Sequence, residues 1–312
     1  MKLCTAILAA ALGVLLAGLP GVAATSPTLP LKVADRDWRP LSQHLDQCLQ
    51  DKLEQALKKH PLWQSLISEE KMAVGLVDLA DPRAPRFARV NGNTMMYAAS
   101  LPKITVMLAA FQGFEDCTLK ETPQLQREMV EMIRRSDNAA ASKVIDQIGL
   151  KKIEAVILDP RYRFYDQRTG GGLWLGSDYG LHLEQYPEPL KNLDHAATVN
   201  QVCRFYYDLA YGRLVNPKRS RQMLKIMAFP DLDDKFVRAL GGTVPANQLF
   251  RKSGEWKLWN SDSMLVWTPG WRRYILVSLI EDAQGEKILQ ELVPAVEKVL
   301  KSSPPSRSVR TR

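Results

Sequence analysis

An apolar segment from Tyr97 to Ala110 carries the most restrictive pattern in this chain, because a serine and a lysine stand three residues apart near its start. The apolar residues predict a buried helix, on which Ser100 and Lys103 share one face within hydrogen-bonding reach. Burial disfavours the charged form of a lysine, and a neutral amine is able to take the proton of a serine hydroxyl. The segment therefore predicts a nucleophilic serine beside its base.

The same spacing occurs a second time, at Ser68 and Lys71, with Glu69 and Glu70 between them. This second match is acidic, precedes a strand-like run and opens no apolar helix, so we interpret it as a solvated turn. A serine and a lysine three residues apart are thus not enough to define a site, and other motifs have to support the first pair.

The first 24 residues have the pattern of an export signal. Lys2 is followed by an apolar run from Ala6 to Leu19 and then by small residues, which is typical of a peptidase cleavage site. The run is too short for a membrane span, although an uncleaved N-terminal anchor is the alternative. Cys4 precedes the apolar run, whereas a lipidated cysteine has to follow it. We expect an exported, periplasmic protein with no membrane span in the mature chain.

Composition argues against several classes of function. Of the 312 residues, 46% are hydrophobic and 24% charged, as in an ordinary globular protein. The formal net charge of +8 lies partly in a basic tail, residues 301–312, which we predict to be disordered. No aromatic-interleaved basic motif indicates a nucleic-acid partner. Four histidines and no CxxC pair make a metal site improbable, and we expect no cofactor.

The mature chain keeps three cysteines, Cys48, Cys117 and Cys203. An odd number in an oxidising compartment allows at most one internal disulfide, and the sequence does not choose the pair. The sequence also leaves the oligomeric state open.

Hydrophobic periodicity divides the chain into alternating helical and extended parts. Helices are expected at 41–60, 98–110, within 121–159, and at 198–211 and 286–300, and strands at 72–79, 86–90, 249–255, 263–268 and 273–280. A long structured loop spans 159–194. The order predicts an α+β fold with an antiparallel sheet of about five strands flanked by N- and C-terminal helices, plus a mostly helical lobe.

The expected organisation is a leader at 25–40, a sheet lobe at about 41–97 and 213–300, and a helical lobe at about 98–212. Ser100 lies where the sheet lobe gives way to the helical lobe, so a cleft is expected there.

Two further motifs stand in a suggestive order. Ser136, Asp137 and Asn138 follow one another between predicted helices, and Lys252-Ser253-Gly254 lies on a predicted strand. Each is weak alone, since residues such as Ser136 and Asp137 often cap helices. Together with Ser100-x-x-Lys103, they form the triple that marks penicillin-recognising serine enzymes.

With these motifs the chain resembles the serine β-lactamase and D,D-peptidase superfamily, and it is most similar to the class A branch. The resemblance covers about residues 41–300 and implies a β-lactamase-like two-lobe fold. It also implies that Ser100 attacks the carbonyl of a β-lactam or acyl-D-Ala-D-Ala peptide and that Lys103 helps to deprotonate it. Ser136 and Lys252 would pass a proton to the leaving nitrogen.

The remaining binding roles also follow from the resemblance. Asn138 would hold the acylamide side chain, and Ser253 with Lys252 would bind the substrate carboxylate, with Gly254 in the same strand. The backbone amides of Ser100 and Glu255 would form the oxyanion hole.

Two features depart from the family pattern. The Glu-x-x-Leu-Asn element that activates the deacylating water has its best counterpart at Glu188, with Asp178 and Glu184 as lesser candidates. Glu188 could equally be a solvated loop carboxylate. Glu255 places a carboxylate beside the substrate strand, where it could repel an anionic substrate or pair with Lys257 or Arg251.

Three functions follow. The first is an exported class A β-lactamase-type hydrolase that opens a β-lactam or related amide. The second is a cell-wall D,D-peptidase or esterase, and the third is a non-catalytic penicillin-recognising module. The expected partner is a small β-lactam or a peptidoglycan peptide.

Overall fold

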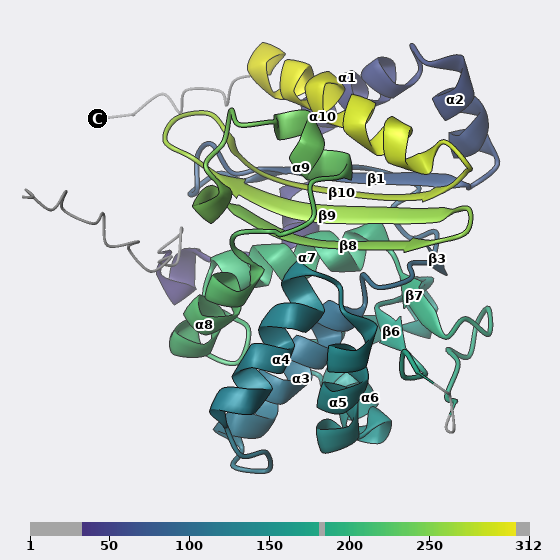
Figure 1. The fold of residues 1–312 in the computed structure, drawn as a ribbon. Helices are drawn as coiled ribbons and strands as arrows, with labels where there is room; N and C mark the ends of the chain where they lie inside the picture. The colour runs from purple at the N-terminus through teal and green to yellow at the C-terminus, as the bar shows by residue number, and fades with distance from the viewer. Residues whose placement is uncertain (1–32, 181–184, 304–312) are drawn as a thin grey trace, which may run out of the picture.

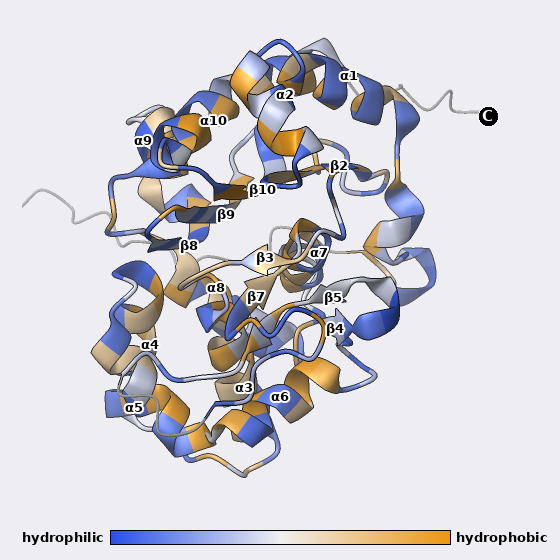
Figure 2. Cartoon of the chain, turned by 90° about the vertical axis from the view of Figure 1, so that its right-hand side faces the viewer, coloured by the Kyte–Doolittle hydropathy of each residue, from blue (hydrophilic) through white to orange (hydrophobic). Residues whose placement is uncertain are grey.

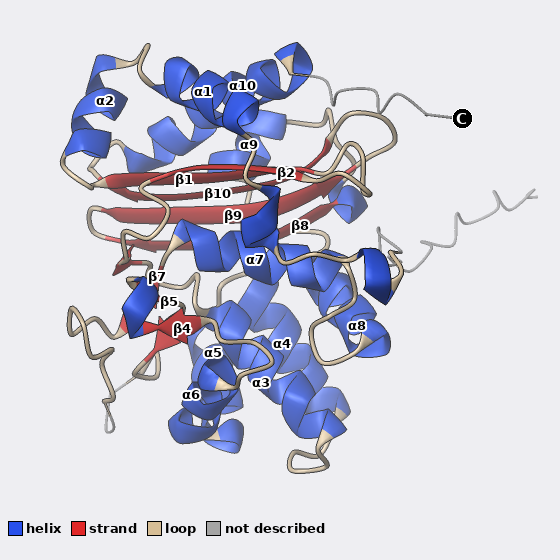
Figure 3. Ribbon diagram, turned by 180° about the vertical axis from the view of Figure 1, so that it is seen from behind, coloured by secondary structure: helices blue, strands red, loops and turns tan. Residues whose placement is uncertain are grey.

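The computed structural model describes residues 33–180 and 185–303. The predicted export signal at 1–24, most of the leader, Glu184 and all but the start of the basic tail lie outside the described residues. Within them, the chain forms one antiparallel sheet with helices on both of its faces (Figures 1 and 3).

The sheet has five strands in the order β2-β1-β10-β9-β8. Their bounds are β1 Met72–Asp78, β2 Arg86–Val90, β8 Leu249–Trp256, β9 Trp259–Trp267 and β10 Arg273–Glu281. All neighbouring pairs are antiparallel. The predicted α+β fold with its five-stranded sheet is confirmed. Strand β8 forms one edge, so one side of its backbone has no strand partner.

Both faces of the sheet are covered, which explains why its strands read as continuous apolar runs. On β1, Val74 and Leu76 belong to the core beneath the outer helices, whereas Ala73 and Val77 belong to the core shared with the helical lobe. Alternate side chains of a strand point to opposite faces, so a strand buried on both sides needs apolar residues at every position.

The outer layer consists of four helices. They are α1 Gln47–Leu57, α2 Pro61–Ser68, α9 Lys235–Leu240 and α10 Gly285–Ser302. In Figure 2 their surfaces mix hydrophilic and hydrophobic residues, as expected of amphipathic helices with one buried face. The predicted helix at 41–60 was wrong at both ends. Asp46 caps α1 by accepting from the Leu49 amide at 2.7 Å, and Pro61 starts a new helix rather than only ending one.

Six helices lie on the other face of the sheet. They are α3 Lys103–Glu115, α4 Pro123–Arg134, α5 Asn138–Ile148, α6 Leu150–Leu158, α7 Val199–Ala210 and α8 Pro217–Met227. Helix α7 packs directly on β1 and β10, and α3 lies in the centre of the lobe, buried from Lys103 to Phe114. Helices α8 and α9 were absent from the sequence prediction, and α8 packs against α4, so this part of 213–300 belongs with the helical lobe.

The described parts of the long loop, 159–180 and 185–194, are structured, as expected. It contains β4 Tyr165–Asp166, β5 Gly171–Gly172 and β6 Trp174–Leu175. Strand β7, His195–Ala197, pairs with β6 on one side and with β3, Met96–Tyr97, on the other. Because β3 leads directly into Ser100, this small sheet holds the loop beside the Ser100 turn.

None of the helices in the described part of the chain is long and apolar enough to cross a membrane. The three described cysteines are all free thiols. Cys48 and Cys117 are exposed and Cys203 is buried.

Candidate active site

Ser100 lies in a turn that leads into α3, not on the helix itself, because α3 begins at Lys103 after Pro102. Ala99, just before it, has a φ of 50°, in the left-handed region that residues other than glycine rarely adopt. The Ser261 hydroxyl donates to the Ala98 carbonyl at 2.9 Å and ties this turn to β9. Strained backbone of this kind is characteristic of functional sites.

Lys103 is buried and its amine is held by the chain between α4 and α5. Its Nζ donates to the Ser136 carbonyl and to Asn138 Oδ1, both at 2.7 Å, and lies 4.2 Å from the centre of the Tyr179 ring. Burial lowers the pKa of Lys103 to about 7, against an opposing effect of the nearby Asp137 carboxylate. A neutral amine has two hydrogens and one lone pair, and these two short bonds use both hydrogens. A third, longer bond to the Asp137 carbonyl at 3.4 Å is the one that a neutral amine gives up, which leaves its lone pair to accept a proton.

Ser136 and Lys252 meet across the junction of the two lobes. Lys252 Nζ, on β8, donates to Ser136 Oγ at 2.8 Å. Burial and then the neighbouring positive charges of Lys103, Arg251 and Lys235 hold the pKa of Lys252 well below its usual value. Ser136 itself has a φ of 58°, a second left-handed residue in the site. The pair forms a hydrogen bond that connects β8 to the helical lobe.

Asn138 and Asp137 occupy the start of α5. Asp137 caps the helix by accepting from the Ala140 amide at 2.6 Å, and Asn138 is its first residue. Helix capping and the contact to Lys103 are thus served by consecutive residues of one motif, and the capping interpretation is correct.

Ser253 and Gly254 follow Lys252 on β8 and are buried. The amine of Lys252 also donates to the Ser253 carbonyl. A Cβ atom at Gly254 would come within 2.7 Å of the Ser100 amide nitrogen, so only glycine allows β8 to approach the Ser100 turn this closely.

A cavity of about 310 Å³ opens over Ser100. Its lining joins residues of the turn, α5, the long loop and β8: Tyr97, Ala99, Ser100, Asn138, Ser177, Tyr179, Asp194, His195, Glu255 and Trp256. The expected cleft between the lobes is therefore present at this position. Sequence reasoning missed Asp194 and His195, and it interpreted Tyr179 only as a packing residue. The available signal was the concentration of such aromatic and charged residues in a glycine-rich loop.

Tyr179 links three parts of this cavity. Its hydroxyl donates to the Ala99 carbonyl at 3.2 Å, and its ring stacks on His195 with centroids 4.4 Å apart. Nε2 of His195 lies 3.3 Å from Ser177 Oγ. The Tyr179 ring also covers the amine of Lys103.

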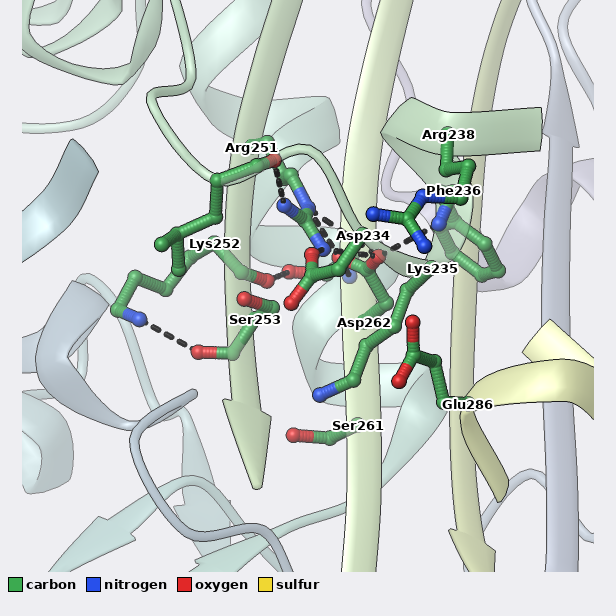
Figure 4. A network of polar contacts seen from close by, with 12 residues as sticks. Asp234, Lys235, Phe236, Arg238, Arg251, Lys252, Ser253, Ser261, Asp262 and Glu286 are labelled. Carbon is green, nitrogen blue, oxygen red and sulfur yellow. Dashed lines mark hydrogen bonds and ion pairs between the residues drawn. The ribbon is translucent and has the colours of Figure 1, made fainter. Parts of the chain in front are cut away.

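Beneath β8 lies a buried charge network (Figure 4). The Arg251 guanidinium forms ion pairs with Asp262 at 2.8 Å and with Asp234. Lys235 is buried, and its Nζ donates to the Gly254 carbonyl at 2.9 Å and lies 3.3 Å from Glu255 Oε2. The expected pairing of Glu255 with Arg251 or Lys257 was wrong. Both carboxylates that hold Arg251 are aspartates, and the partner of Glu255 is Lys235.

Glu188 is buried in the long loop and organises it. Its carboxylate accepts from the Tyr165 hydroxyl at 2.9 Å and from the amides of Leu190, Lys191 and Leu193 at 2.8, 2.6 and 3.3 Å. The expectation of a solvated carboxylate was wrong, since only 1% of Glu188 is exposed. The side chain is also not among those that line the cavity over Ser100. Asp178, the lesser candidate, accepts from the Gly180 amide at 3.1 Å.

Across residues 33–180 and 185–303, no group of three or more His, Cys, Asp or Glu side chains is arranged to hold a metal ion. Ser100 and Asn138 line the cavity, and the buried amine of Lys103, of lowered pKa, donates to Asn138. The buried amine of Lys252, also of lowered pKa, donates to the Ser136 hydroxyl. This set is suited to acyl transfer by proton exchange between side chains.

Solved structures with the same fold include a β-lactamase from Sphaerobacter thermophilus, 18% identical, with a TM-score of 0.60 over 82% of this chain and 99% of that one. PBP-A is 17% identical, with a TM-score of 0.58 over 83% and 97%. A class A β-lactamase from Bacteroides cellulosilyticus is 17% identical, with a TM-score of 0.59 over 81% and 99%. At these identities the likeness shows the fold alone. No curated protein sequence matches the chain.

A sequence model of the β-lactamase enzyme family matches residues 114–299. The match spans Ser136, Asn138 and Lys252 and begins after Ser100 and Lys103. The fold brings the two parts together, since Asn138 lines the cavity with Ser100 and accepts from Lys103. With more than half of its length matched, the chain belongs to the β-lactamase enzyme family.

Proposed function

We propose that this protein is an exported serine hydrolase that opens a β-lactam or a related amide through an acyl-enzyme on Ser100. The observation that carries the proposal is the environment of Lys103. Its amine is buried, has a pKa of about 7, and donates to Asn138, a residue that lines the cavity over Ser100. Such an amine is a base that functions at neutral pH.

In the acylation step, Ser100 Oγ attacks the carbonyl carbon while its proton passes to the lone pair of Lys103 Nζ. The carbonyl π electrons move to oxygen, and the proposed acceptors of that charge are the backbone amides of Ser100 and Glu255. Two donors aimed at a developing oxyanion lower the barrier by several kcal/mol, about 3 for each.

The tetrahedral intermediate then collapses. The C–N bond breaks, and the leaving nitrogen takes a proton from the Ser136 hydroxyl, which is replaced by one from Lys252 across the 2.8 Å contact. The step leaves Lys103 with the proton of Ser100 and Lys252 one proton short, and Lys103 gives its proton to solvent while Lys252 takes one up. Proton balance is thereby restored, and the product is an ester on Ser100.

Deacylation is where the second candidate function gains support. Glu188 is the proposed base for the hydrolytic water, but its carboxylate already accepts four hydrogen bonds and lies outside the cavity lining. A long-lived acyl-enzyme, as in a D,D-peptidase or esterase that reacts slowly with β-lactams, fits this geometry. A solved structure of a PBP-A variant is described as an acyl-enzyme complex with penicillin G.

A chromogenic cephalosporin distinguishes the candidate functions when absorbance and intact protein mass are followed together. Sustained colour release supports a β-lactamase. One equivalent of colour with a persistent mass increase supports the peptidase or esterase. The absence of both signals supports a non-catalytic module. Ser100→Ala is the control, and an equally active Ser100→Ala protein would overturn the proposed mechanism.

Export is part of the proposal and has its own test. The small residues at 21–24 predict cleavage after Ala24, so the mature protein should begin at Thr25. N-terminal sequencing of protein recovered from the periplasm measures this directly. An intact Met1 on membrane-associated protein would instead support an uncleaved anchor.

A further inference from the structure

One buried cation beneath the substrate strand is already neutralised by the protein. Lys235 is buried beneath β8, and its amine lies 3.3 Å from the carboxylate of Glu255, whose side chain is more than half exposed at the cavity wall. In Figure 4 the Lys235 side chain points toward Ser261, away from the Arg251 network. A substrate carboxylate that approached Lys235 would have to displace Glu255.

The other charges around the cavity do not compensate. Asp194 adds a second carboxylate to the lining, close enough to help raise the pKa of Tyr97. The amines of Lys103 and Lys252 are buried and already hydrogen-bonded within the protein. The cavity wall also carries the rings of Tyr97, Tyr179 and Trp256, whose faces attract cations.

We propose that Glu255, with Asp194, selects substrates by charge, so that the site acylates neutral or cationic amides and esters in preference to carboxylate-bearing ones. This inference rests on the proposed function, because it concerns the same acylation at Ser100. It differs from the sequence-based expectation that Lys252 and Ser253 anchor a substrate carboxylate. An anionic group would enter a cavity whose solvent-facing charges are negative, and like charges at close range are strongly unfavourable.

The test uses three thioesters of one N-acyl-D-alanine that differ only in the thiol. Mercaptoacetate is anionic, mercaptoacetamide is neutral, and thiocholine carries a fixed positive charge. Loss of thioester absorbance gives kcat/KM without a thiol reagent, which would also react with the exposed Cys48 and Cys117. Each variant is compared with the unmodified protein on the same substrate, so differences between leaving groups cancel.

Glu255→Gln is expected to raise the ratio of kcat/KM for the anionic over the neutral thioester about tenfold, and to lower the cationic-to-neutral ratio. Asp194→Asn should shift both ratios in the same directions. The matched control is Glu54→Gln on α1, since Glu54 also lies 3.3 Å from a lysine but on the outer helical layer. It should leave both ratios unchanged.

Charge selection would be overturned if Glu255→Gln changed kcat/KM equally for all three thioesters. It would also be overturned if Glu54→Gln shifted the ratios as much as Glu255→Gln does. Either result would leave acylation at Ser100 intact. Failure of the proposed function has a different signature. In that case the unmodified protein and Ser100→Ala would react alike with every thioester, and both proposals would fall together.

Discussion

At the scale of single residues, the site depends on amines that are buried but still hydrogen-bonded. Lys103 gives up hydration, yet its amine regains two short hydrogen bonds and the face of the Tyr179 ring. Desolvation lowers the pKa, while the hydrogen bonds keep the amine in one orientation. The result is a base whose proton affinity and direction are both set by its surroundings.

The acylation rate should therefore rise with pH. Lys103 has a pKa of about 7, so its amine is protonated and inactive as a base below that value and free above it. Measured by intact mass in single-turnover experiments between about pH 5.5 and 8.5, the rate should climb with an apparent midpoint near 7. A rate that is flat or falls over this range would show that another group accepts the proton.

Glu188→Gln is expected to destabilise the protein. Both oxygens of the carboxylate accept from the chain, and an amide would turn a donor toward the donors of Tyr165 or the loop amides. The free energy of unfolding in urea should fall by about 1 to 3 kcal/mol. Glu128→Gln, at an exposed position on α4, is the control and should leave the unfolding midpoint unchanged.

The same variant addresses catalysis. If Glu188 activates the deacylating water, the acyl-enzyme should persist in Glu188→Gln and decay in the unmodified protein. Identical decay in the two proteins would leave Glu188 with the role of loop organiser alone.

At the scale of elements, the edge strand β8 is held in place from below. Arg251 and Asp262 are cross-strand neighbours on β8 and β9, and both are almost completely buried. Asp262 also accepts from the Phe236 amide at the start of α9. One ion pair thus joins two strands and the helix that carries Lys235.

Arg251→Met should therefore cost about 3 to 5 kcal/mol of unfolding free energy, because it leaves the buried Asp262 carboxylate without its cation. Urea or thermal unfolding followed by circular dichroism measures the loss. Arg135→Met provides the comparison, since Arg135 pairs with Asp231 at the surface, and it should leave the midpoint within error. Similar losses in the two variants would contradict this account.

At the scale of the whole molecule, the active site exists because two lobes touch at a few points. Gly254 on β8 faces the Ser100 turn, while Gly75 on β1 faces Cys203 of α7. Both glycines lie where the sheet meets the helical lobe, but only the first contact positions a residue of the cavity.

Gly254→Ala should separate β8 from the Ser100 turn and lower the acylation rate by about 100-fold. Gly75→Ala introduces a comparable clash, 2.5 Å from Cys203 Sγ, away from Ser100. It should lower the thermal midpoint without the same loss of acylation per folded molecule. Equal loss of acylation in the two variants would show that lobe packing in general, not the Gly254 contact, controls the site.

The sequence by itself determined the sheet and the main chemical groups. β1 and β10 are largely apolar because both faces of the sheet are buried, and β1, β2 and β10 were predicted within a residue or two. The polar start of β9 was missed because an aspartate such as Asp262 is typical of a loop. Its place in a buried strand depends on the ion pair with Arg251. Helices α8 and α9 were missed because their apolar positions are too few to show a clear period.

Only the tertiary structure decided how these groups are used. Local patterns placed Ser100, Ser136 and Lys252 in the chain, but the pairing of Glu255 with Lys235 and the covering of Lys103 by Tyr179 join residues distant in sequence. Charge and solvation depend on every neighbour within several ångströms, and a sequence does not state those neighbours. The candidate acylating groups were therefore recognisable in the chain, whereas their surroundings and the charge of the cavity required the fold.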